Sequence, residues 1–320
     1  MINDRKQLIK LADPKTNKGW VRAVARLMSL AERSPEDAVA LVTELSGSSK
    51  PRIILGITGA PGSGKSILVS RLIAVFRAMH PDKRVGVIAV DPSSPFSGGA
   101  ILGDQIRMME HSGNEMVFIR SVATRGQTGG ITFGTLGTLC VMGHIGCDIV
   151  LIETVGVGQS EVGVREVADI VAVVLAPGQG DTVQFLKAGL MEIGDCFVVN
   201  KSDRPDAPGY RALLADALVL LGKSSGVDRT NDIFSTSARD NTGITALAEY
   251  MEKRYAENSG DWDIYRTENM HAIIRRLIIE KCKERAKEKL AMMMDPVGRI
   301  LSGAETVESI SEELFSLLVH

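Results

Sequence analysis

The chain has 320 residues, of which 44% are hydrophobic and 24% charged, and its formal net charge is −2. These are ordinary values for a globular protein, and the near-neutral charge gives no general electrostatic reason to bind nucleic acid or an anionic membrane. No apolar run approaches the roughly 18 residues of a membrane-spanning helix, and no signal-peptide core follows the first residues. The four cysteines follow no disulfide pattern. We therefore expect a cytoplasmic protein that binds neither nucleic acid nor membrane.

The first 50 residues are expected to form helices ahead of the main domain. One apolar face recurs at helical spacing and comprises Trp20, Val24, Leu27, Met28 and Ala31. A second helix is predicted to begin with Ser34 as N-cap and Pro35 at its first position. It should end before residues 47–51, which read as a linker. These helices are most simply packing elements.

From residue 53 to about 255, apolar runs alternate with amphipathic stretches, which predicts a parallel sheet flanked by helices. The predicted strands are 53–58, 85–90, 117–120, 148–153, 170–176, 196–200 and 233–236. The predicted helices are 65–79, 130–145, 182–193, 208–222 and 244–257. In such a sheet, ligands bind at the carboxyl ends of the strands, and the polar motifs of this chain fall at those ends.

The segment directly after the first strand, residues 59–66, reads G-A-P-G-S-G-K-S and fits the phosphate-loop pattern G-x-x-x-x-G-K-[ST]. Glycines let backbone N–H groups close around phosphate oxygens, and the following helix adds its dipole. Lys65 is predicted to reach the β- and γ-phosphates, and the Ser66 hydroxyl to ligate Mg²⁺. Further nucleotide contacts are assigned to Gly62, Ser63, Gly64 and Ile67. An ordinary Gly-rich turn would not require the strand and helix that flank this segment.

Acidic residues end two other predicted strands. Asp91 follows strand 85–90, where it can meet Mg²⁺ directly or through water, or simply form an Asp-Pro turn. Glu153 ends strand 148–153 in the manner of a Walker B residue, with a strand cap as the alternative. Gly156, three residues later, would let a backbone N–H approach a γ-phosphate.

The sequence N-K-S-D at 200–203 follows another strand and matches the guanine reader of GTPases. Asp203 would accept two N–H bonds from guanine, Asn200 would contact the base edge, and the stem of Lys201 would pack along the ring. Adenine would leave the carboxylate unpaired. Ser237 and Ala238 end the next strand and resemble the loop whose backbone contacts the guanine carbonyl. These motifs predict a GTPase that uses GTP/GDP and Mg²⁺.

Cys140, His144 and Cys147 are spaced i, i+4 and i+7, which would place them on one helix face. A metal site there would need at least one more ligand. The segment leads into a buried strand, where small residues suit packing. Packing is therefore the favoured interpretation.

The composition shifts after residue 260. Residues 269–294 read as one long helix with an apolar edge and a mixed-charge segment that suits a solvated face. Pro296 and Gly298 are expected to interrupt it, and 305–319 should form a last amphipathic helix. We expect this region to be an arm that dimerises or binds a partner.

Taken together, these segments closely resemble the MeaB/ArgK/MMAA family of P-loop GTPases. The matching blocks are G-x-P-G-x-G-K-S at 59–66, V-D-P-S-S-P at 90–95, G-G-x-I-L-G-D at 98–104, R-S-x-A-T-R-G at 120–126, E-T-V-G-V-G-Q-S-E at 153–161, P-G-x-G-D at 177–181 and N-K-x-D at 200–203. Several of these blocks are longer than generic GTPase motifs, and the match covers about residues 20–255.

The resemblance implies an α/β P-loop NTPase fold of the SIMIBI type with a mostly parallel sheet. Its expected divisions are a helical N-terminal extension (1–50), a GTPase domain (51–258) and a helical C-terminal arm (259–320). It further implies a homodimeric G-protein chaperone that gates adenosylcobalamin loading of an acyl-CoA mutase, typically methylmalonyl-CoA mutase, and protects or reactivates that enzyme.

The same resemblance implies roles for individual residues. Ser66, Asp91, Asp104 and Glu153 would form the Mg²⁺ and water shell, and Lys65 joins the three acids as a catalytic residue. The loops 92–107, 154–164 and 177–188 would be switches, with Asp181 and Lys187 in the one that responds to the mutase.

Two departures from related patterns affect the expected rate. Ala60 stands where deviant phosphate loops of dimeric ATPases carry a signature lysine, so that position supplies no cross-subunit lysine. Val157, and not glutamine, follows Gly156. We therefore expect slow intrinsic hydrolysis, with the partner or an Asp-held water completing the site.

Three alternatives remain at this point. A GTP-dependent nickel metallochaperone shares the fold but usually carries a His-rich tract or Cys-His pair near the switches. A P-loop kinase, as in the older name arginine/ornithine transport kinase, would be expected to use ATP, against which N-K-x-D argues. A third is a scaffold in which the nucleotide only holds a dimer together.

Overall fold

The computed structural model describes residues 2–48, 50–91, 113–123, 131–154, 163–178, 189–225, 232–258 and 285–319, with isolated positions between 266 and 283. The chain forms two compact units, Met1–Asp263 and Ile264–His320. Within the described residues, no helix is both long and apolar enough to cross a membrane.

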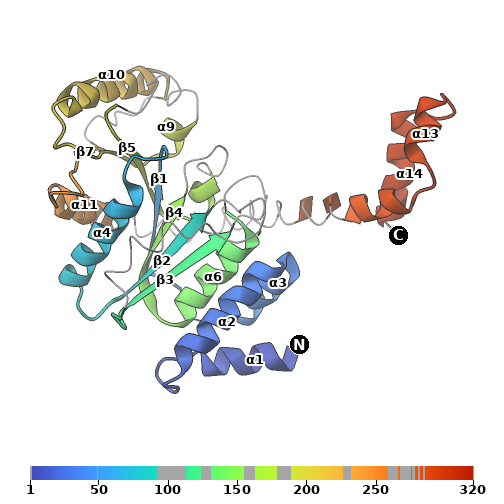
Figure 1. The fold of residues 1–320 in the computed structure, drawn as a ribbon, viewed down its shortest axis with the longest axis horizontal. Coiled ribbons are helices and arrows are strands. Elements are labelled where there is room, and N and C mark those ends of the chain that lie inside the picture. Colours follow the sequence, from blue (N-terminus) through green and yellow to red (C-terminus); the bar gives the residue numbers. More distant parts are fainter. Residues whose placement is uncertain are drawn as a thin grey trace. The chain divides into compact units, whose positions relative to one another are not determined.

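The first unit is built on a seven-stranded sheet in which every pair of neighbouring strands is parallel (Figure 1). The strands are β1 (Ile53–Thr58), β2 (Arg84–Asp91), β3 (Val117–Ala123), β4 (Cys147–Thr154), β5 (Ile170–Leu175), β6 (Cys196–Val199) and β7 (Ile233–Ser235). Their order is β3-β2-β4-β1-β5-β6-β7. All seven predicted strands are confirmed, with bounds that shift by three residues at most. The predicted parallel α/β fold is therefore correct.

The register of the central strands brings their carboxyl ends together. Ile57 in β1 lies beside Glu153 in β4, and Val90 in β2 lies beside Thr154. Strands β4 and β5 lie on opposite sides of β1, so the connection between them crosses β1 and the strand order reverses there. Such a reversal opens a crevice for ligands at the carboxyl edge of an α/β sheet. The phosphate-loop motif follows β1 directly.

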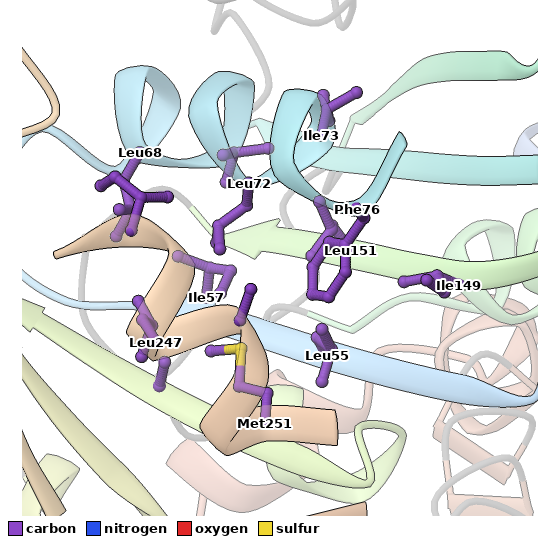
Figure 2. Close-up of a cluster of buried hydrophobic side chains, with 14 of the residues drawn as sticks. Leu55, Ile57, Leu68, Leu72, Ile73, Phe76, Ile149, Leu151, Leu247 and Met251 are labelled. Atoms are coloured by element: carbon purple, nitrogen blue, oxygen red, sulfur yellow. The ribbon is translucent and has the colours of Figure 1, made fainter. Parts of the chain in front are cut away.

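One face of the sheet is covered by α4 (Lys65–Met79) and α11 (Ile244–Glu257). Figure 2 shows Leu72 and Phe76 of α4 and Met251 of α11 turned toward Leu55 and Ile57 of β1. Successive residues of a strand point to opposite faces, which is why the odd-numbered residues of β1 reach this cluster. Burying each of these large side chains contributes about 1.5–3 kcal/mol. The cluster fixes the helix that begins in the phosphate loop.

The opposite face is covered by α6 (Phe133–His144), since a side chain at Gly86 of β2 would meet Met142, whereas Val85 and Val87 belong to the other face. Helices α9 (Leu190–Ile193) and α10 (Ala207–Ser225) accompany β5, β6 and β7. Of the predicted helices, 65–79 and 244–257 match their bounds. The segment predicted as helix at 182–193 lies outside the described residues up to 188.

The N-terminal helices are α1 (Ile2–Leu11), α2 (Trp20–Arg33) and α3 (Pro35–Glu44). Helices α2 and α3 lie against α6, and α1 packs on α2 (Figure 1). As predicted, the Ser34 side chain caps α3 by accepting a bond from the Asp37 N–H, and Pro35 opens the helix. Gly137 of α6 is the point of closest approach, because a Cβ added there would lie 2.6 Å from the Cβ of Ala31. These helices therefore form a layer of the same compact unit as the sheet.

This close approach predicts a stability effect. The G137V variant should lower the free energy of unfolding by about 2 kcal/mol or more, because the valine side chain has no room between α6 and Ala31 of α2 and one of the helices must shift. The matched control is G209V on α10, where an added Cβ has no neighbour within 4 Å, and which should change stability by no more than about 0.5 kcal/mol. Urea unfolding of both variants measures this. Equal midpoints would contradict the packing described for α6.

The second unit contains α13 (Pro296–Leu301) and α14 (Val307–Val319). The last predicted helix is thus confirmed. The helix before Pro296 ends at residue 292, as the predicted interruption requires. Asp295 then caps a new helix by accepting a bond from the Gly298 N–H, and Pro296 takes its first position. Proline suits that position because its missing N–H has no helical partner there. Of the predicted helix 269–294, residues 285–292 are described and helical, and most of the remainder lies outside the described residues.

Candidate nucleotide-binding site

The loop between β1 and α4 has a backbone that requires glycine at three positions. Gly59, Gly62 and Gly64 have φ values of 135°, 75° and 90°, a region that side chains with a Cβ rarely adopt. A Cβ at Gly59 would lie 2.1 Å from the carbonyl oxygen of Val174, and one at Gly64 would lie 2.5 Å from Asn200 Nδ2. The glycines thus allow the loop to pass directly against β5 and the N-K-S-D segment. Its position at the start of α4 suits the binding of phosphate.

Lys65 is buried at the first turn of α4 and its ammonium group turns back over the loop. Its Nζ donates to the carbonyl oxygens of Gly59, at 2.7 Å, and Ala60, at 3.0 Å. These bonds hold the positive charge at the mouth of the loop, where the sequence predicted a phosphate contact. The neighbouring Ile67 points outward and is 43% exposed.

Ser66 and Glu153 meet at the carboxyl edge of the sheet. The Ser66 hydroxyl donates to Glu153 Oε1 at 2.7 Å, and both side chains are buried. A hydroxyl and a carboxylate at this distance are the oxygen ligands that Mg²⁺ prefers. The residues present therefore fit the predicted metal. Next to Glu153, the Thr154 hydroxyl donates to the Thr58 hydroxyl at 2.9 Å and ties the end of β4 to the end of β1. This contact was not predicted from the sequence.

The other predicted metal and phosphate residues are described in part or not at all. Asp91 ends β2 beside Ala123 of β3, which puts its backbone at the same sheet edge, while its side chain lies outside what the structure describes. Asp104 and Gly156 lie outside the described residues. So do the predicted switch residues Asp181 and Lys187.

Asn200 connects three segments through its side-chain amide. Its Nδ2 donates to the carbonyl oxygen of Ser63 at 2.9 Å, and its Oδ1 accepts from the Ala238 N–H and the Thr236 hydroxyl, both at 3.2 Å. The amide thus joins the phosphate loop to the loop after β7. Thr236 was not singled out from the sequence, although a hydroxyl next to Ser237 and Ala238 could have signalled this role.

Lys201 and Asp203 complete the loop after β6. Lys201 adopts a left-handed backbone conformation, with φ of 57°, and its Nζ donates to the Gly62 carbonyl oxygen at 2.8 Å. Its stem therefore extends from the predicted base site to the phosphate loop. Asp203 is exposed, and its Oδ1 accepts a bond of 2.9 Å from the buried Ser237 hydroxyl. A carboxylate held at one oxygen leaves acceptor capacity for a ligand.

The candidate metal cluster on α6 does not form. Cys147 is the first residue of β4 and lies beyond the end of α6 at His144, which corrects the shared helix face assumed from its spacing. His144 bonds through Nε2 to the Ile9 carbonyl oxygen and through Nδ1 to the Ser48 hydroxyl, both at 3.1 Å. Burial raises the pKa of the Cys140 thiol to about 11 and that of the Cys147 thiol to about 12. Protonated thiols are poor metal ligands, and no group of three metal-ligating side chains occurs in the described part of the chain.

Comparison with known families gives a match to the model for methylmalonyl-CoA mutase-associated GTPase MeaB over residues 24–291. The chain belongs to the MeaB family. This MeaB-family chain is 40% identical over 288 residues to a protein named as a GTPase from Pyrococcus horikoshii, covering 89% of this chain and 90% of that relative. It is 39% identical over 216 residues to the mitochondrial methylmalonic aciduria type A homologue of Mus musculus, covering 66% of this chain and 51% of the relative.

The fold of this MeaB-family P-loop GTPase is also found among solved structures. A crystal structure of a LAO/AO transport system kinase aligns with a TM-score of 0.64 over 99% of this chain and 98% of that one, at 21% identity. At that identity the likeness concerns the fold. It agrees with the parallel α/β architecture described above.

Proposed function

We propose that this protein is a GTP-hydrolysing G-protein chaperone that gates adenosylcobalamin loading of an acyl-CoA mutase of the methylmalonyl-CoA mutase type and helps protect or reactivate it. The observation that carries the proposal is the family match over residues 24–291, because the family is described by its association with methylmalonyl-CoA mutase. The site supports the GTP part of the proposal independently, since phosphate loop, Ser66–Glu153 pair and N-K-S-D segment lie along one edge of the sheet.

The described residues divide the work of binding and hydrolysis. Lys65 neutralises charge on the β- and γ-phosphates, and the loop N–H groups hold their oxygens. Ser66 and Glu153, with Asp91 and Asp104, would hold Mg²⁺, which when bound neutralises charge that develops on the phosphates. Asp203 accepts the guanine N–H groups. Asn200 holds the phosphate loop and the loop after β7, which we call the base loop, in a fixed position relative to each other. Gly156 remains the candidate for contact with the γ-phosphate. The Val157 side chain has no polar group to orient the attacking water, so we propose that the protein alone hydrolyses GTP slowly.

We further propose that the second unit makes the protein a homodimer. Ile310 is the buried hydrophobic residue in the described part of this unit. Many others are exposed, namely Ile278, Ile279, Leu290, Met292, Met294, Val297, Leu301, Val307 and Phe315. An exposed apolar surface of this extent is typical of an interface, and a second copy is the commonest partner.

The proposed dimer can be tested by introducing one charged residue into its interface. Leu301 is 81% exposed, and in a dimer the L301E variant should bury a carboxylate at the interface and shift the solution mass toward the monomer. The matched control is L220E on α10, also an exposed leucine, which should keep the mass of the unmodified protein. Light scattering after size-exclusion chromatography measures both. Identical masses for the two variants would remove α13 from the interface.

The experiment that tests the proposed function measures phosphate release from GTP and ATP by the purified protein, alone and with candidate cobalamin-dependent mutases. We expect slow turnover of GTP, none of ATP, and a rise in the GTP rate with one mutase. The E153Q variant controls for contaminating phosphatases, because it keeps the shape of Glu153 but removes the charge proposed to hold Mg²⁺. If no mutase raises the rate of GTP hydrolysis, the protein would still be a GTPase, but the proposed chaperone role would be excluded.

A further inference from the structure

The loop after β7 contains a second carboxylate beside the proposed guanine reader. The Ser237 hydroxyl lies 2.9 Å from Asp203 Oδ1 and 3.0 Å from Asp240 Oδ2. Both carboxylates are exposed, while Ser237 is only 1% exposed. A serine hydroxyl carries one proton, so it can donate to one of these two carboxylates at a time.

The backbone around Ser237 is fixed, which leaves its hydroxyl as the movable part. The Ser237 N–H and carbonyl both pair with Thr242, each at 3.1 Å. The Asp240 N–H also donates to Ser237 Oγ, at 3.2 Å. Gly243 closes the loop in a conformation where a Cβ would lie 2.2 Å from the Ser235 carbonyl oxygen. Rotation of one hydroxyl therefore decides which carboxylate receives the bond.

We propose that Asp240 is a positioning residue of the guanine site, which competes with Asp203 for the single proton of Ser237 and thereby weakens the hold on Asp203. This inference rests on the proposed guanine-binding function. When Ser237 donates to Asp203, it fixes one carboxylate oxygen and orients the group for the two N–H donors of guanine. When it donates to Asp240, Asp203 lacks its bond to Ser237. Asp240 thus lowers guanine affinity without touching the nucleotide.

The test is titration calorimetry with GDP, inosine diphosphate (IDP) and ADP. The D240A variant should bind GDP about threefold to tenfold more tightly, the effect of securing one hydrogen bond. The gain should be smaller for IDP, which lacks the 2-amino group and engages Asp203 through one N–H. The D216A variant, which removes an exposed carboxylate from α10, controls for net charge and should leave GDP affinity unchanged.

A double-substitution cycle separates positioning from a general effect on the loop. In the S237A background there is no proton to compete for, so adding D240A should leave GDP affinity unchanged. A gain that persists in that background, an equal gain for IDP, or no gain in D240A alone would each overturn the inference while leaving a guanine site in place. An unmodified protein that does not prefer GDP over ADP would overturn the proposed function, and the inference with it.

Discussion

The D203N variant is expected to exchange guanine for xanthine as the preferred base. The Ser237 hydroxyl, 2.9 Å from Asp203 Oδ1, would hold the asparagine oxygen and turn its amide NH₂ toward the ligand. Two donors would then face each other across the guanine edge, and GDP affinity should fall about 100-fold or more, because a site built for a hydrogen bond strongly rejects a mismatched group. Xanthine carries a carbonyl where guanine has its amine, so affinity for xanthosine diphosphate should rise.

The matched control for this exchange is D206N. Asp206 lies three residues further on, where both its oxygens accept bonds from Arg204 at 3.0 Å. Losing that exposed ion pair should change nucleotide affinity by less than about threefold. Titration calorimetry with both diphosphates measures the two variants. If D203N still prefers GDP, Asp203 does not read the base.

The K65A variant is expected to lose at least about 100-fold in the rate of GTP hydrolysis. Lys65 Nζ is held at the loop by the Gly59 and Ala60 carbonyl oxygens, and removing a fixed donor to developing charge typically has an effect of this size. Its fold should persist, since the loop conformation depends on its glycines. Single-turnover phosphate release measures the rate.

The control for K65A is K253A, which removes an exposed lysine of α11 that pairs with Glu257 at 3.7 Å. Its hydrolysis rate should equal that of the unmodified protein. Thermal unfolding of K65A distinguishes lost chemistry from lost structure. A folded K65A protein that hydrolyses GTP at the normal rate would exclude the phosphate-contact role.

Features of the site that follow from local sequence could be predicted. The apolar run of β1, the glycine pattern of the loop and the N-K-S-D segment each carry their chemistry within a few neighbouring residues. The structure brings the loop and the N-K-S-D segment together at one edge of the sheet. The bond between Asn200 and Ser63 joins residues 137 positions apart, and no local pattern contains such a pairing. The same holds for the contact of Gly137 with Ala31, which depends on how two helices approach.

The differences between prediction and structure have a similar cause. Cys147 satisfied a helical spacing, but the strand that starts there is set by its pairing with β2, where Arg84 lies beside Cys147. Pro296 was predicted to interrupt the long helix because a proline cannot continue one, and the helix before it does end at residue 292. It was not predicted from the sequence that Pro296 also begins a new helix, α13, for which Asp295 supplies the cap. In both cases a residue's neighbours in space or at the cap decided the outcome.

The amide of Asn200 also has a kinetic consequence. Because one side chain holds the phosphate loop through Ser63 and the base loop through Ala238, the two ends of the proposed nucleotide site are braced by the same group. A nucleotide whose base begins to leave would disturb the loop around its phosphates, and a partner that moves either loop would loosen both. Release of GDP should therefore proceed as a single concerted step, so that exchange kinetics would show one exponential phase, whichever loop a partner engages.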